Sequence, residues 1–140
     1  MDGKSLFIAG TMPFIILGAI HIIYTMIDIR TPRKLAPYKD EVRLSMLGST
    51  LMLTRQTNMW RAWLGFNISH GMGALFFGLV YLSIAEFDFS LLLKITPLLY
   101  LAPIMALGYL ILSVKYWFNV PVVGASIGLA CFVAGVLISL

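Results

Sequence analysis

Four long apolar blocks, separated by short polar segments, dominate the hydrophobic pattern of the chain. They run from about 6 to 29, 60 to 85, 91 to 118 and 120 to 140. Each block has the length of roughly 20 residues or more that a helix needs to cross a bilayer. The pattern therefore predicts an all-α fold, a single four-helix transmembrane bundle. Its last two helices are expected to form an antiparallel hairpin at Asn119.

The segment between the first two blocks, residues 30–59, is too polar to span a membrane. Between residues 38 and 53, the side chains of Val42, Met46 and Leu53 fall near one face of a helix. This pattern is typical of an amphipathic helix that lies in the membrane interface. It is equally typical of a structured loop packed on the bundle, and the sequence leaves both interpretations open.

Composition supports the membrane interpretation. Of the 140 residues, 60% are apolar and 11% are charged, whereas soluble domains average about 25% charged residues. So few charges cannot cover a soluble globule, which excludes an ordinary cytosolic enzyme, a disordered chain and a coiled coil. The single cysteine, Cys131, excludes an internal disulfide and a cysteine-based metal site.

The basic residues are unevenly distributed along the chain. Seven of the ten lie between the first two spans or at their ends: Arg30, Arg33, Lys34, Lys39, Arg43, Arg55 and Arg61. Lys115, at the end of the third span, is expected on the same side of the membrane. The positive-inside rule then places residues 30–59 in the cytoplasm and both termini outside. We therefore interpret the net charge of +4 as a signal of membrane orientation, with no nucleic-acid partner.

Polar residues inside the spans are the candidates for chemistry, because such residues usually face protein or a cavity. His21 and His70 lie about 12 and 15 Å from the basic ends of their helices, at nearly one depth. Tyr24 and Asn67, three residues away from these histidines, share their helix faces. Tyr109 reaches a comparable depth on the third span. We expect these five residues to line one polar pocket in the cytoplasmic half.

Three interpretations of this pocket remain open. A lipid, a quinone or another amphiphile could bind there, with Arg55, Trp60 and Arg61 at the rim suiting an anionic head group. Alternatively, His21 and His70 could be the axial metal ligands of a b-type haem. The third interpretation is structural, with a histidine hydrogen-bonded across helices to a polar neighbour.

Catalysis has little support in the sequence, and we name no catalytic residue. Asp28 is the one carboxylate near a span interior, and we expect it to pair with Arg30 or Arg61. The usual constellations of acid, base, nucleophile and metal ligand are absent from the spans. An accessory subunit of a larger membrane complex is therefore the alternative to a binding protein.

Two stripes of small residues in the spans predict close helix packing, either within the bundle or in a homo-oligomer. Gly65, Ser69 and Gly73 recur every four residues in the second span, and Gly124 and Gly128 repeat this spacing in the fourth. Small residues at this spacing allow helix backbones to approach one another.

Near the start of the second span, Thr57 or Asn58 is expected to cap the helix.

The motif LTRQTNMWRAWLGFNISHGMG, with GAIHIIYT upstream and a KYWF–P junction downstream, resembles a family of small bacterial four-span integral membrane proteins. A looser similarity, by topology alone, relates the chain to DoxX-like proteins. The resemblance covers most of the chain and implies the four-span fold in a bacterial cytoplasmic (inner) membrane, among membrane lipids. It implies no particular activity.

Overall fold

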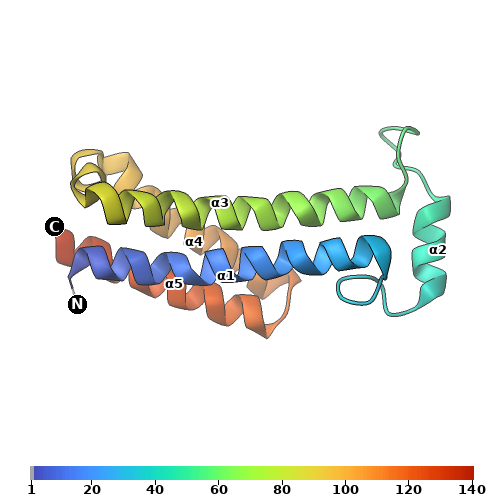
Figure 1. Cartoon of the computed structure of the whole chain (residues 1–140), viewed down its shortest axis with the longest axis horizontal. Helices are drawn as coiled ribbons and strands as arrows, with labels where there is room; N and C mark the ends of the chain where they lie inside the picture. The colour runs from blue at the N-terminus through green and yellow to red at the C-terminus, as the bar shows by residue number, and fades with distance from the viewer. Residues whose placement is uncertain (1) are drawn as a thin grey trace. The chain divides into compact units, whose positions relative to one another are not determined.

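The computed structural model describes residues 2–140, which form five α-helices (Figure 1). These are α1 (Gly3–Arg30), α2 (Asp40–Gly48), α3 (Met59–Lys94), α4 (Thr96–Tyr116) and α5 (Asn119–Ser139). All of them except α2 are long and apolar enough to cross a membrane. This confirms the predicted all-α, four-span architecture, which is that of a multi-pass membrane protein.

The break predicted between the second and third spans, at residues 86–90, lies inside α3. Two helical segments meet there, because the backbone of Asp88 is non-helical, with φ −152° and ψ 77°, and the second segment ends at Lys94. The hydroxyl of Ser90 donates to Oδ1 of Asp88 over 2.6 Å at this junction. Helix α4 begins at Thr96 and not near residue 91, because Pro97 suits the first turn of a helix.

The helices differ in length in a way that bears on their depth. Helix α1 has 28 residues and is about 42 Å long, whereas α4 and α5 are each about 32 Å long. A bilayer measures about 30 Å across its hydrocarbon core and about 40–45 Å with its head groups. Helices α4 and α5 therefore match the hydrocarbon core, while an untilted α1 reaches into the head-group layers.

The described residues fall into two compact units. The first, called here the aromatic unit, contains the residues up to Leu17 together with Ala74–Leu140. The second, the polar unit, is the continuous segment Gly18–Gly73. Both α1 and α3 contribute to both units, while α4 and α5 belong to the aromatic unit and α2 to the polar unit.

Large rings and small residues form the core of the aromatic unit. Phe132 is fully buried, with its ring centroid 5.4 Å from that of Phe7 and 6.0 Å from that of Phe77. A Cβ atom added to Gly128 would lie 3.1 Å from the carbonyl oxygen of Gly10. The small residues of α5 thus bring its backbone against α1 within this unit. Helices α4 and α5 form the predicted hairpin, since two residues separate them.

The polar unit holds the segment that links the first two spans. Helix α2 is shorter than the predicted amphipathic stretch 38–53, and it lies roughly at right angles to the neighbouring ends of α1 and α3 (Figure 1). The following hairpin is closed by a bridge between Thr50 and Asn58. Oδ1 of Asn58 accepts the backbone N–H of Arg61 over 2.9 Å. This contact confirms the predicted cap of α3.

Candidate functional site

The two histidines of the spans do meet in the polar unit. The ring centroids of His21 and His70 are 5.2 Å apart, with 73° between the ring planes. Nδ2 of Asn67 donates to the backbone carbonyl of Trp63 over 2.8 Å, so its Oδ1 faces His21. Nε2 of His21 lies 2.9 Å from that Oδ1. Because a carbonyl oxygen can only accept, this arrangement assigns a proton to Nε2 of His21.

Helices α1 and α3 are in direct contact beside this histidine–asparagine cluster (His21, Asn67 and His70). A Cβ atom at Gly71 would lie 3.1 Å from the carbonyl oxygen of Gly18. The ring of His70 also stacks on that of Phe66, with the centroids 6.3 Å apart. Asn67 thus bonds to His21 across the two helices, and the cluster joins α1 to α3.

The histidine pair does not fit a haem held between its two rings. Axial ligation requires one nitrogen of each imidazole to point at the same iron, with the macrocycle between them. Here Nε2 of His21 is engaged by Asn67, and the two imidazoles contact each other edge to face. The backbone contact at Gly71 leaves no room for a macrocycle between the helices at this level.

Two of the other predicted site residues have contacts of their own. Tyr24 is exposed, and the ammonium of Lys34 lies 5.1 Å from the centre of its ring. Tyr109 belongs to the aromatic unit, where its ring centroid lies 5.5 Å from that of Phe14. Tyr109 is therefore part of an aromatic core.

The three residues predicted at the rim occupy different places. Trp60 is buried in the first turn of α3. Arg61 follows it and is exposed, with its backbone N–H bonded to Asn58. Arg55 is exposed on the hairpin formed by Thr50–Asn58. Of the three residues predicted at the rim, one is thus a buried ring and two are exposed cations.

Asp28 has a role that the sequence did not reveal. Its side chain is 1% exposed, and its Oδ1 accepts the backbone N–H groups of Arg33 and Lys34, each over 2.8 Å. Its Oδ2 accepts the N–H of Leu35 over 2.6 Å. The predicted pairing with Arg30 or Arg61 is therefore replaced by backbone hydrogen bonds. They satisfy the carboxylate without burying a second charge, which would carry its own desolvation cost.

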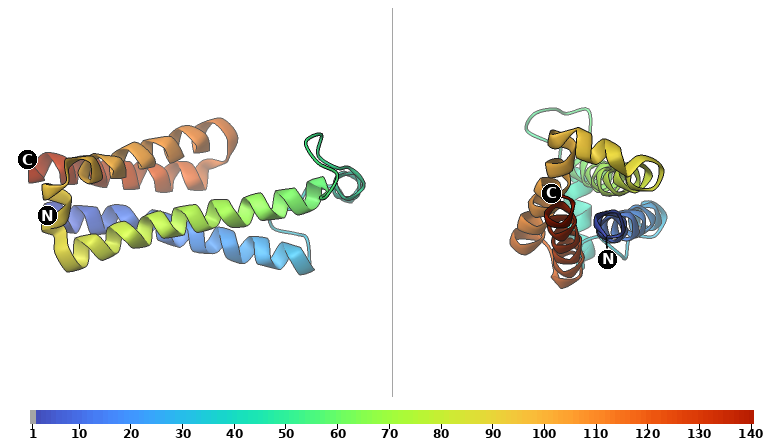
Figure 2. Two further views of the ribbon diagram at one scale, coloured as in Figure 1. Left: turned by 90° about the horizontal axis from the view of Figure 1, so that it is seen from above. Right: turned by 90° about the vertical axis from the view of Figure 1, so that its left-hand side faces the viewer.

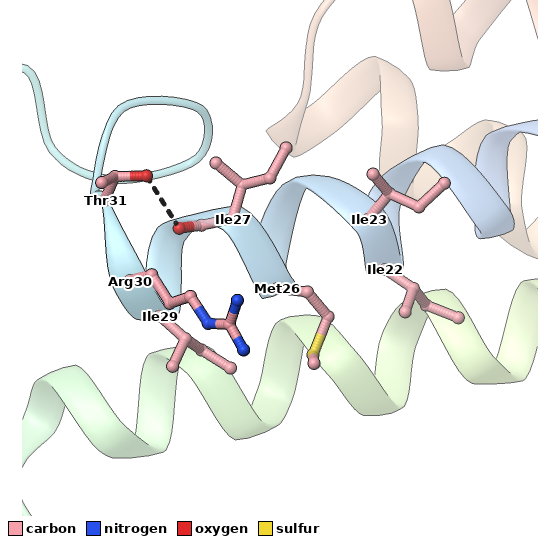
Figure 3. A pocket seen from close by; sticks show the side chains of 7 residues that line it. All are labelled: Ile22, Ile23, Met26, Ile27, Ile29, Arg30 and Thr31. Carbon is pink, nitrogen blue, oxygen red and sulfur yellow. Dashed lines mark hydrogen bonds between the residues drawn. The ribbon is translucent and has the colours of Figure 1, made fainter.

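A hollow of about 540 Å³ lies along the last three turns of α1. It is called here the α1 hollow and is lined by Ile22, Ile23, Met26, Ile27, Ile29, Arg30 and Thr31. Figure 3 shows the guanidinium of Arg30 turned back toward Met26, at the end of an otherwise apolar wall. The hydroxyl of Thr31 donates to the carbonyl of Ile27 over 3.4 Å.

The α1 hollow and the eight predicted site residues do not coincide. Every residue that lines the hollow among those described comes from α1 or directly follows it. A sequence signal does exist, because Ile22, Met26 and Ile29 share one helical face that ends beside Arg30. A stripe of this kind is also what any lipid-facing helix shows, so it carries no mark of a site by itself.

Comparison of the chain with family models, with curated proteins and with solved structures gave no match. Among residues 2–140, no group of three histidine, cysteine or acidic side chains is placed to hold a metal ion. The α1 hollow and the histidine–asparagine cluster are therefore interpreted from their own geometry.

Proposed function

We propose that the protein is a small integral membrane protein that binds an amphiphile in the α1 hollow. The observation that carries this proposal is the combination of an apolar wall with a single cation at its end. The five aliphatic and methionine side chains of the lining offer contact to a hydrocarbon tail, and Arg30 offers hydrogen bonds and charge to a head group. Among amphiphiles, this pattern favours a lipid with an anionic head group over a neutral quinone.

The depth of the hollow agrees with this assignment. Ile22 and Ile29 lie about 10 Å apart along the helix axis, a span that accommodates part of one acyl chain. Arg30 is the last residue of α1, a helix that is long enough to reach the head-group layer. A bound lipid would thus keep its head at the level of its neighbours in the bilayer.

The buried carboxylate of Asp28 contributes by positioning. Its three hydrogen bonds hold the backbone of residues 33–35 against the end of α1. The loop that leaves Arg30 therefore starts in a fixed direction, which limits the conformational freedom of the head-group end of the hollow. The exposed side chains of Arg33 and Lys34 add positive potential nearby.

The distribution of charge supports a position of the hollow in the cytoplasmic leaflet. Because basic loops remain in the cytoplasm, we assign the 31–58 segment to the cytoplasmic side of a bacterial inner membrane, with both termini outside. The ligand would then come from the cytoplasmic leaflet, whose anionic lipids attract basic segments at its surface.

Mass spectrometry of the intact protein, released from mild detergent, tests the proposal. We expect an anionic lipid to remain bound to the native chain and to be lost in Arg30→Gln. The matched control is Lys39→Gln, which removes an exposed cation outside the hollow. Met26→Trp, which narrows the hollow with a larger side chain, should also weaken lipid retention while leaving every charge in place.

Three other outcomes would contradict binding of an anionic lipid in the α1 hollow. Equal lipid retention in Arg30→Gln and Lys39→Gln would show that general charge, and not the hollow, holds the lipid. A protein recovered in fixed stoichiometry from native membranes, with no bound lipid, would favour the accessory-subunit function. Co-purification of a quinone that survives Arg30→Gln would assign the ligand to a neutral class.

A further inference from the structure

The hairpin Thr50–Asn58 exposes apolar side chains at its tip. Met52 is 108% exposed and Leu53 is 95% exposed, relative to the free residues. The hairpin is nevertheless an ordered turn, because Thr50 and Asn58 form a bridge and the N–H of Met59 donates to the carbonyl of Ser49 over 2.8 Å. Two adjacent, fully exposed apolar residues on an ordered turn are costly in water.

Within the polar unit, the hairpin projects to one side of the axis of α3. Figure 1 and the right-hand view of Figure 2 both show it extending sideways from the start of α3, and not along the axis of that helix. In Figure 1 it points away from α1. For a spanning helix, sideways is the plane of the membrane surface, so this direction carries the tip over the surrounding lipid.

The level of the hairpin follows from its attachment. It joins α3 directly at Asn58, and the indole of Trp63, one turn into α3, is exposed. Exposed tryptophan rings of spanning helices sit at the membrane interface. Six residues separate Met52 from Met59 in the chain, and the closed hairpin keeps the tip within reach of that interface.

Charge favours a lipid surface as the occupant. Residues 31–61 contain six basic and two acidic residues, a net charge of +4. Arg55 lies two residues beyond Leu53 and is exposed. Apolar side chains next to basic ones are the combination that binds the interface of an anionic leaflet.

We propose that the hairpin Thr50–Asn58 is a membrane anchor that inserts Met52 and Leu53 into the head-group layer of an anionic leaflet. Arg55 contacts lipid phosphates beside the inserted pair. The anchor is distinct from the α1 hollow, because it shares no residue with it. It would hold the start of α3 at a fixed depth and so fix the level of the histidine–asparagine cluster.

Site-directed fluorescence in lipid nanodiscs tests this anchor. With Cys131→Ser as the background, an environment-sensitive label is placed at Met52→Cys or, as the matched control, at the exposed Glu41→Cys on α2. Lipids brominated near the head of the acyl chain should quench the label at position 52 at least about twofold more than at position 41. Adding phosphatidylglycerol to phosphatidylcholine should strengthen the difference, and Arg55→Gln should reduce it.

Two results would overturn the anchor. The first is a label at position 52 that aqueous iodide reaches as readily as the label at position 41, in both lipid compositions. The second is a label that is water-accessible in nanodiscs but shielded in native membranes, which would identify a protein as the occupant. Arg30→Gln separates this proposal from the lipid hollow, since it should release the bound lipid and leave quenching at position 52 unchanged.

Discussion

Different interactions stabilise the interior of the aromatic unit and the interior of the polar unit. In the aromatic unit, rings pack against small residues, with Phe132 fully buried among Phe7, Phe14 and Phe77. In the polar unit, the central contacts are hydrogen bonds, between His21 and Asn67 and between Asp28 and the backbone of residues 33–35. The two units thus use the two means of cohesion available to a membrane protein.

The difference shows where specificity can arise in this chain. Packing of apolar rings in lipid fixes a helix arrangement but presents no donor, acceptor or charge to a ligand. The polar unit contains the Asp28 loop, seven of the ten basic residues and the α1 hollow, so its side chains can distinguish one ligand from another. Substitutions in the aromatic unit should therefore lower overall stability, whereas substitutions in the polar unit should alter local structure or ligand binding.

The largest effect is expected from Phe132→Ala in the aromatic unit. Removing a fully buried ring leaves a cavity and should lower the free energy of unfolding by about 3–5 kcal/mol. Unfolding in mixed micelles, followed by circular dichroism, measures it. Leu137→Ala, at an exposed position of the same helix, should have little effect. Equal losses in the two variants would contradict the ring-centred core.

Asp28→Ala should have the next largest effect, and a local one. Three backbone N–H groups lose a charged acceptor, and since water can replace part of it we expect a loss of roughly 2–3 kcal/mol. Hydrogen exchange at residues 33–35 should accelerate strongly, while exchange around Phe132 stays unchanged. Asp40→Ala is the control, because the Asp40 side chain is 86% exposed and its ion pair with Arg43 is worth about 1 kcal/mol or less.

The third largest effect on stability is expected from substituting a closely packed glycine, compared with an open one. Gly128→Ala places a Cβ atom 2.5 Å from the ring of Phe14 and 3.1 Å from the carbonyl of Gly10, and overpacking of this kind costs about 1–3 kcal/mol. Gly65→Ala meets nothing within 4 Å and should leave monomer stability unchanged. A dimer that weakens on Gly65→Ala, measured by crosslinking in membranes, would assign the Gly65 stripe to contacts between copies.

Much of the fold could be predicted from the sequence because the bilayer imposes a simple rule. Apolar stretches of spanning length must be helical there, so the four spans and the short link before Asn119 follow directly. The exact end of the second span is harder to predict, because it is set by the non-helical Asp88, which accepts a hydrogen bond from Ser90 where two helical segments meet. Turn contacts and side-chain bonds, and not hydropathy, decide that detail.

The candidate site could be predicted less completely. The similar depths of His21 and His70 predict that they lie at one level, because helical rise is regular, and their rings are in contact. It could not give the partner of Asn67, which depends on helix rotation. The sequence predicts an arginine partner for the carboxylate of Asp28, because opposite charges lie nearby in the chain. The observed partners are backbone N–H groups, and their positions depend on the conformation of residues 31–36.

The smallest effect is expected in the histidine–asparagine cluster, where it tests the pairing itself. A double-mutant cycle between His21→Leu and Asn67→Leu should give a coupling free energy of about 1 kcal/mol, the usual value for a polar contact between membrane helices. The same cycle between His70→Leu and Asn67→Leu should give a clearly smaller value, because Asn67 bonds to His21. Nitrogen NMR of labelled histidine should find the proton of His21 on Nε2 and should lose that signature in Asn67→Leu. Coupling that is larger to His70 would contradict the pairing of His21 with Asn67, because it would require α1 and α3 to be rotated away from their close approach at Gly71.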